Sequence, residues 1–96
     1  MEGPAEEIET FCRRTFTFGS LGRLSTEKNF ITLLEAFGHL LSRGLDVQLL
    51  IMGEGQQRPV LEEFIQRHDF AGKVLMPGYV SGAERYLPLL GAYVLS

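Results

Sequence analysis

The sequence predicts an α/β fold, a doubly wound parallel sheet that stops after about four strands. Two observations favour this fold class. Short β-prone or almost wholly apolar runs alternate with longer segments in which apolar residues recur every three or four positions. Glycines and prolines separate the two kinds of segment. Because strands that alternate with helices are joined by right-handed crossovers, we expect the strands to run parallel in one sheet.

The first half of the chain predicts a strand, an amphipathic helix and a buried strand. Residues 15–21 alternate threonine with phenylalanine, which suits a strand. Residues 29–44 space their apolar side chains as a helix with one buried face does, and Gly44 supplies the C-terminal stop. Residues 47–52 are almost wholly apolar, and such strands usually lie at the centre of a parallel sheet.

The second half continues the alternation. A helix is expected from Pro59, because proline suits the first helical turn. Residues 73–80 are the third expected strand, residues 82–90 carry a short helix, and residues 92–96 are the fourth strand. With a strand order of 3-2-1-4, the first two helices cover one face of the sheet and the third covers the other. The expected inner face of the helix from Pro59 consists of Val60, Leu61, Phe64, Ile65 and His68.

The 96 residues are enough for one small domain, which we expect over residues 15–96. Residues 1–14 carry four glutamates and no clear period, so we expect a linker or a loosely docked arm. This acidic start lacks the apolar stretch of a signal peptide, and no apolar run approaches the roughly 18 residues of a membrane helix. We therefore expect a cytoplasmic protein with no membrane segment in this chain.

Composition excludes several classes of function. The formal net charge is −3 and no basic block interleaves with aromatic residues, so no nucleic-acid partner is expected. The single cysteine, Cys12, excludes an internal disulfide. His39 and His68 have no second ligand at metal spacing, and the adjacent Glu62 and Glu63 face different ways on a helix. We expect no metal, no cofactor and no catalytic residue within the chain.

The turn after the first expected strand has the features of an anion site. In open parallel sheets, ligands bind outside the carboxyl ends of the strands. Gly22 allows close approach of a ligand, and the free N–H groups of the following helix point at the same place. Arg23 can grip phosphate oxygens in a fork, and Lys28 adds a mobile point charge. The pair suits a diphosphate; the alternative is that both are solvated loop charges.

Two further turns are expected at the same edge of the sheet. Residues 53–55, Gly-Glu-Gly, follow the second strand and either line a ligand or simply make the turn. Residues 77–80 close the third strand, where backbone groups can pair with a flat base. The glycine spacing of the dinucleotide fingerprint is absent, and so is the Gly-Lys-Ser/Thr that a P-loop needs.

These motifs, in this order, resemble the start of the C-terminal domain of retaining glycosyltransferases of family four (group 1), which have the two-Rossmann GT-B architecture. Residues 22–24 and Lys28 match the family pattern Gly-Arg-Leu-x-x-x-Lys-Gly, although Asn29 stands where the family often has glycine. Residues 53–55 match its Gly-x-Gly element, and residues 78–80 match Gly-x-Val. The resemblance covers the whole domain expected above.

The resemblance implies a nucleotide-sugar donor, a UDP-, GDP- or ADP-sugar, as the binding partner. It implies that Arg23 and Lys28 hold the donor diphosphate and that backbone near Met76 to Val80 meets the base. The residues implied to shape the pocket wall and to meet the base are Gly22, Gly53, Gly55, Met76, Gly78, Tyr79 and Val80.

The resemblance also implies that the chain is a fragment. The family's acidic Glu-x7-Glu element lies after the strand where the chain ends, and the N-terminal acceptor domain is missing. We expect the diphosphate-binding half of a donor site, without a catalytic centre, from an enzyme that transfers a sugar with retention. The alternatives are a non-catalytic nucleotide-binding or regulatory module and a functionless truncated product.

Overall fold

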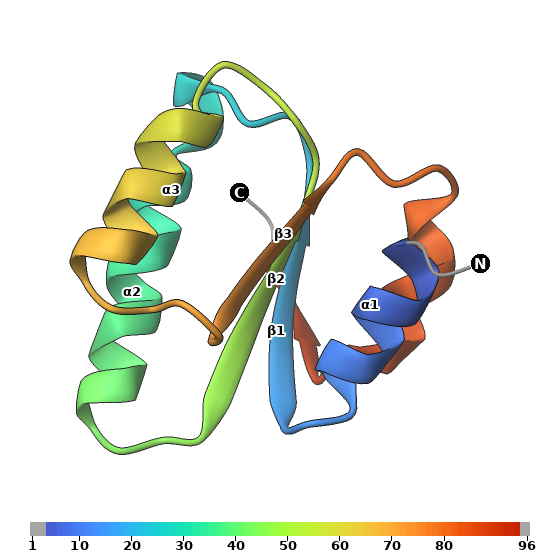
Figure 1. Ribbon diagram of the computed structural model, residues 1–96, viewed down its shortest axis with the longest axis horizontal. Coiled ribbons are helices and arrows are strands. Elements are labelled where there is room, and N and C mark those ends of the chain that lie inside the picture. Colours follow the sequence, from blue (N-terminus) through green and yellow to red (C-terminus); the bar gives the residue numbers. More distant parts are fainter. Residues whose placement is uncertain (1–3, 95–96) are drawn as a thin grey trace.

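The computed structural model describes residues 4–94 and confirms the doubly wound parallel sheet (Figure 1). Every strand pair is parallel, and the strand order is β3-β2-β1-β4. The fourth strand was expected over residues 92–96, and its last two residues lie outside the described part of the chain. The elements are α1 (Pro4–Cys12), β1 (Phe16–Leu21), the 3-10 helix η1 (Thr26–Lys28), α2 (Phe30–Ser42), β2 (Val47–Met52), α3 (Arg58–Arg67), β3 (Val74–Gly78), the 3-10 helix η2 (Ala83–Leu89) and β4 (Ala92–Tyr93).

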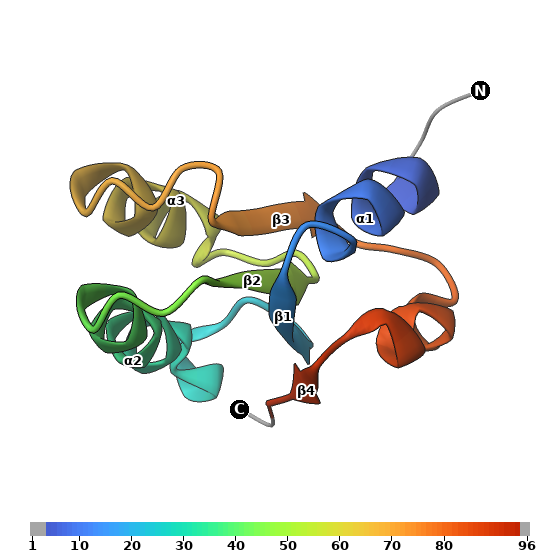
Figure 2. The same ribbon diagram turned by 90° about the horizontal axis from the view of Figure 1, so that it is seen from below.

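Helices cover both faces of the sheet, with α2 and α3 on one face and α1 and η2 on the other (Figure 2). All six residues of β2 are buried, as its apolar sequence predicted for a central strand. Leu49 and Ile51 join the core on the α2–α3 side, whereas Leu50 and Met52 join the core on the α1–η2 side. The alternation along one strand therefore supplies two separate hydrophobic cores.

Helix α1 corrects the expectation that residues 1–14 form a linker or a loosely docked arm. Ile8 is fully buried and Phe11 nearly so, and their spacing of three places both on one side of the helix. The buried Gln48 side chain donates hydrogen bonds to the Phe11 carbonyl oxygen and to Thr17 Oγ1. The second face of the sheet is thus covered by α1 as well as by η2, and the two contact each other.

The buried face of α3 is narrower than the spacing of its apolar residues predicted. Leu61 is buried, and Phe64 and Ile65 are partly buried against the same core. Val60 is 45% exposed, so its side chain lies outside that face. His68 is also exposed and stacks on the Phe64 ring with centroids 4.0 Å apart. The helix therefore contributes one fully buried side chain, Leu61, and the partly buried ring of Phe64.

Candidate functional site

The turns that follow β1 and β2 are hydrogen-bonded to each other at the carboxyl edge of the sheet. The Gly22 amide donates to the Met52 carbonyl oxygen at 3.1 Å, which continues the ladder between the two strands. Beyond it, the Leu24 amide donates to the Glu54 carbonyl oxygen at 3.0 Å, and the Gln57 amide donates to the Leu24 carbonyl oxygen at 3.0 Å. Backbone hydrogen bonds therefore join the two turns into one platform.

Gly53 and Gly55 are glycines because the neighbouring turn lies directly against them. A Cβ atom at Gly53 would overlap the Gly22 carbonyl oxygen, and one at Gly55 would overlap the backbone of Leu24. Backbone atoms locked in a ladder cannot move aside for a side chain. The sequence left open whether these glycines line a ligand or simply make the turn. Both make the turn, and each also lines a pocket.

A pocket of about 330 Å³ opens at this edge between the turns that follow β1, β2 and β3. It brings together several of the residues that the sequence analysis singled out, because the carboxyl ends of parallel strands meet at one edge. Its lining consists of Leu21, Gly22, Arg23, Met52, Gly53, Glu54, Tyr79 and Val80. A second pocket, of about 550 Å³, lies between the turns after β1 and β2 and includes Arg23 and Gly55.

Arg23 and Lys28 are placed differently at this edge, because Arg23 lines both pockets and Lys28 lines neither. Arg23 is exposed and lines both pockets. The Lys28 side chain is half-buried, and its Nζ lies 3.9 Å from the position that a Cβ of Gly22 would take, over the end of β1. Within residues 4–94, neither cation has a hydrogen-bond or ion-pair partner. Arg58, Arg67 and Lys73, in contrast, are each paired with a carboxylate.

The backbone conformation of Asn29 explains why asparagine can stand where the family pattern often has glycine. It caps α2 with φ 56° and ψ 47°, the left-handed region, just after the η1 turn that carries Lys28. Glycine adopts this conformation freely, and asparagine tolerates it better than most other residues. The position demands a backbone shape, and Asn29 supplies that shape.

The other residues of the third turn lie beside the pocket. Met76 is buried in the core, and its carbonyl oxygen accepts a hydrogen bond from Arg58 Nη2 at 2.8 Å. Gly78 has φ 94°, and its carbonyl oxygen accepts from the Gly53 amide at 2.9 Å. Tyr79 and Val80 are therefore the residues of this segment that reach the pocket.

Comparison with known proteins decides the family. A family model described as glycosyl transferases group 1 matches residues 6–95, nearly the whole chain. The chain belongs to the group 1 glycosyl transferases. Alpha-D-kanosaminyltransferase of Streptomyces kanamyceticus is 36% identical over 61 residues, which cover 64% of this chain and 16% of that relative. The family match begins inside α1, so the helix is part of the family's domain.

Two solved structures of glycosyltransferases confirm the GT-B type of fold for this group 1 chain. The pneumococcal O-GlcNAc transferase GtfA, solved with UDP and GlcNAc, aligns over 86% of this chain with a TM-score of 0.78 at 20% identity. A TarM mutant of S. aureus, solved with UDP, Fondaparinux and alpha-GlcNAc-glycerol, aligns over 99% with a TM-score of 0.78 at 18% identity. The chain spans 16% of the first structure and 18% of the second.

Sequence reasoning overlooked one pair at the site of this glycosyl transferase segment. Glu54 lines both pockets beside Arg23, and its carboxylate pairs with Arg58 at 3.2 Å. No helical spacing signals this pair, because α3 begins at Arg58 and Glu54 lies in the turn ahead of it. The pair forms because the turn after β2 brings Glu54 beside the first residue of α3.

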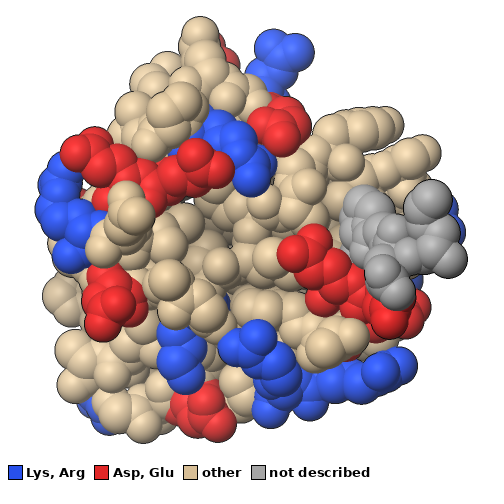
Figure 3. All heavy atoms as spheres, in the orientation of Figure 1, with Lys and Arg blue, Asp and Glu red and all other residues tan. Residues whose placement is uncertain are grey.

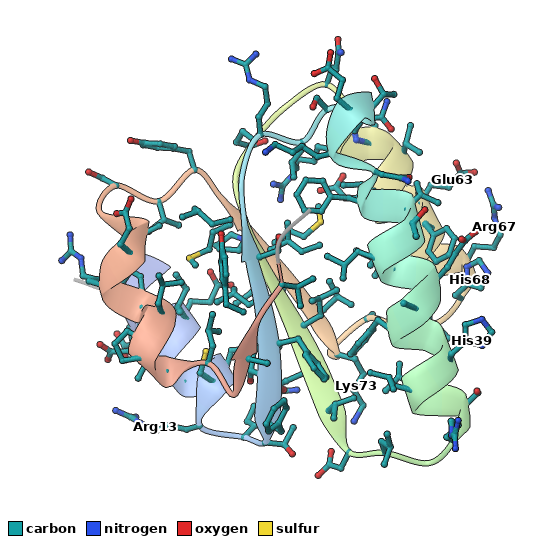
Figure 4. All side chains as sticks on the ribbon, turned by 180° about the vertical axis from the view of Figure 1, so that it is seen from behind. Arg13, His39, Glu63, Arg67, His68 and Lys73 are labelled. Carbon is teal, nitrogen blue, oxygen red and sulfur yellow. The ribbon has the colours of Figure 1, made fainter. Side chains whose placement is uncertain are left out.

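The described residues contain neither a metal-binding cluster nor a helix that could span a membrane. Among the residues that the structure describes, no group of three or more histidine, cysteine, aspartate or glutamate side chains is placed to hold a metal ion. His39 and His68 lie on the outer sides of α2 and α3 (Figure 4). No helix within residues 4–94 is long and apolar enough to span a bilayer. The cytoplasmic location stays a prediction.

Proposed function

We propose that this chain carries the diphosphate-binding half of a nucleotide-sugar donor site, in a glycosyltransferase that acts with retention. One observation carries the proposal. Arg23 and Lys28, two cations without partners in the described chain, flank the end of β1 where a pocket opens. The donor is a UDP-, GDP- or ADP-sugar, and the two similar transferase structures were both solved with UDP.

The two cations would act on the leaving group. When the glycosidic bond to the donor phosphate breaks, the nucleoside diphosphate leaves with growing negative charge. A guanidinium fork and an ammonium beside the oxygens stabilise that charge. Removing one such preorganised donor typically costs about 2.7–4 kcal/mol of barrier in an enzyme. Arg23 and Lys28 would each contribute on this scale in the whole protein.

The base would lie against the third turn. Tyr79 is 75% exposed and lines the pocket with Val80, so its ring is free to stack on a flat base. Stacking on an aromatic ring contributes about 1–3 kcal/mol per base and tolerates different bases. Tyr79 and Val80 would therefore accept a base without selecting uracil, guanine or adenine.

The acceptor site and the acidic Glu-x7-Glu element would lie in a longer protein. The chain spans 16% of the length of its curated relative, so we place the rest of the catalytic machinery outside it. A non-catalytic nucleotide-binding module would use the same pocket. The transferase names of the similar proteins favour the enzyme over that module.

The proposal is tested by titrating UDP against three variants, with ligand-observed NMR as the readout. For wild type we expect a Kd on the order of 0.1–10 mM, because the ribose and sugar contacts are missing. Arg23→Ala removes a forked, charge-assisted contact of about 1.5–3 kcal/mol, which weakens binding at least tenfold. Lys28→Ala should weaken binding less, since an ammonium on a flexible stem often makes a single bond.

The matched control is Arg13→Ala. Arg13 is also an exposed cation, but it lies ahead of β1, at the opposite end of that strand (Figure 4). Its loss changes the net charge equally and should leave the UDP affinity unchanged. If Arg23→Ala and Lys28→Ala bind UDP as tightly as Arg13→Ala does, the two cations are solvated loop charges and the proposal is wrong.

A further inference from the structure

Arg58 joins three segments at the carboxyl edge of the sheet. Its Nη1 pairs with Glu54 Oε2 at 3.2 Å, in the turn after β2, and its Nη2 donates to the Met76 carbonyl oxygen at 2.8 Å, in β3. Its Nε pairs with Glu62 Oε2 at 2.8 Å, within α3. Charges of both signs alternate over α3 in Figure 3, in line with these pairs and with the Glu63–Arg67 pair.

Glu54 is a carboxylate at an edge where an anion is to bind. Its carbonyl oxygen accepts a hydrogen bond from the Leu24 amide, which holds its backbone against the turn after β1. It lines the same two pockets as Arg23, and its Oε2 lies 2.7 Å from the position that a Cβ of Gly78 would take. An unpaired carboxylate here would repel phosphate and compete for Arg23.

We propose that Arg58 is a positioning residue of the donor site: it occupies the Glu54 carboxylate, which leaves Arg23 free for phosphate, and it holds β3 at the Met76 carbonyl. This role rests on the diphosphate site proposed above. Arg58 neutralises a carboxylate of the pocket although it lies outside the pocket itself. Arg58 lines neither of the two pockets at this edge, and its side chain is 28% exposed. It therefore acts through Glu54.

The test uses inorganic pyrophosphate as the probe, because it reports on the phosphate subsite and not on the base. Arg58→Gln leaves Glu54 unpaired beside Arg23, so pyrophosphate binding should weaken about two- to fivefold, as for a partly screened charge. Glu54→Gln alone should bind pyrophosphate at least as tightly as wild type. The double variant Arg58→Gln, Glu54→Gln should return to within about twofold of wild type, because the unpaired carboxylate is gone.

Arg67→Gln is the matched control. Arg67 and Glu63 form an ion pair at 3.0 Å with the same spacing on the same helix, on its outer side (Figure 4). The substitution removes the same charge and leaves a glutamate unpaired, but away from the pocket. Pyrophosphate binding should not change. A purely structural role of Arg58 would lower thermal stability without any rescue of pyrophosphate affinity by Glu54→Gln.

Arg58→Lys extends the test if Arg58→Gln does not fold, as judged by dispersion of its amide resonances. Lysine keeps a charge for Glu54, so this variant should bind pyrophosphate within about twofold of wild type. A loss of more than fivefold in the lysine variant would overturn the inference. So would an Arg58→Gln variant that binds like wild type, or a double variant that binds as weakly as Arg58→Gln.

The two proposals fail differently. If wild type binds neither UDP nor pyrophosphate, the diphosphate site itself is wrong. If wild type binds both and Arg58→Gln leaves pyrophosphate affinity unchanged, the donor site stands and the role of Arg58 is wrong.

Discussion

Asn29 shows how one backbone conformation constrains a position next to the site. Its φ of 56° lies in the left-handed region, where most residues with a Cβ are strained. We predict that Asn29→Ala lowers the free energy of unfolding by about 1–2 kcal/mol, whereas Asn29→Gly changes it little. Urea unfolding of the three proteins measures both effects. Equal losses for alanine and glycine would show that the asparagine side chain, and not the backbone shape, is what matters.

The Cys12 thiol predicts how stability and thiol reactivity change with pH. Burial raises the pKa of the Cys12 thiol above its ordinary value, and a hydrogen bond with Thr17 opposes the shift. The thiol therefore ionises later in the folded than in the unfolded chain. Its contribution to stability is complete below the unfolded pKa and is lost as the pH rises through the folded pKa. Iodoacetamide should alkylate Cys12 more slowly than a free thiol at pH 8, because less thiolate is present. Alkylation at the rate of free cysteine would contradict this.

Sequence reasoning predicted which residues gather at the carboxyl edge, but not how they are supported. Arg23, in the turn after β1, and Tyr79, after β3, come from different turns, and the parallel topology brings such turns to one edge. Only the three-dimensional structure shows why residues 53 and 55 are glycines, since the reason is the close approach of a neighbouring turn. Whether Arg23 and Lys28 bind diphosphate stays a prediction.

At the scale of elements, α1 is the part of the fold that the sequence did not predict. Its apolar signal is a single pair, Ile8 and Phe11, among glutamates, and a nine-residue helix is not stable on its own. The helix forms because the sheet offers a partner face and because Gln48 fixes the Phe11 carbonyl. Long periodic segments such as α2 carry enough signal to be predicted, whereas a short docked helix does not.

The docking of α1 can be measured. We predict that Ile8→Ala lowers the free energy of unfolding by about 2–5 kcal/mol, because a fully buried side chain is truncated and a cavity remains. Glu7→Gln is the control, since Glu7 is exposed on the same helix and its loss should change stability by less than about 0.5 kcal/mol. Chemical denaturation gives both values. A loss below 0.5 kcal/mol for Ile8→Ala, as is typical of exposed positions, would mean that the arm is loosely docked after all.

The edge of the sheet at β3 is protected in two ways. Pro77 has no N–H to offer a further strand, and Arg58 occupies the Met76 carbonyl oxygen. Edge strands in natural proteins use proline and covering side chains to avoid pairing with another chain. The same arginine thus serves the sheet edge and, by our inference, the phosphate subsite.

At the scale of the whole molecule, the alternation of strands and helices predicted the parallel sheet, and the strand order that the structure has was considered as one possible arrangement. Right-handed crossovers leave few ways to arrange four parallel strands, and β3-β2-β1-β4 is one of them. The family assignment followed from short motifs at ordered intervals, and the family match over residues 6–95 confirms it. Activity is a property of the longer enzymes, and the chain spans 16% of its curated relative.

We predict that the 96 residues, expressed by themselves, transfer no sugar. By our proposal the chain offers half of a donor site, and binding a leaving group with no acceptor held beside it does not catalyse transfer. A panel of nucleotide sugars and acceptors, followed by mass spectrometry of the products, measures this. Product formed faster than in buffer would show that the polypeptide contains a catalytic centre.

The most direct test of the central claim is a map of backbone amide shifts in the wild-type chain, recorded during titration with UDP and, separately, with uridine. We predict that UDP shifts the amides of residues 22–29 and of Tyr79 and Val80, while uridine shifts only the latter two. Raising the salt concentration should reduce the UDP shifts and leave the uridine shifts nearly unchanged, because ions screen charge and not stacking. UDP shifts that spare residues 22–29, or that do not respond to salt, would contradict the claim that Arg23 and Lys28 form a diphosphate site.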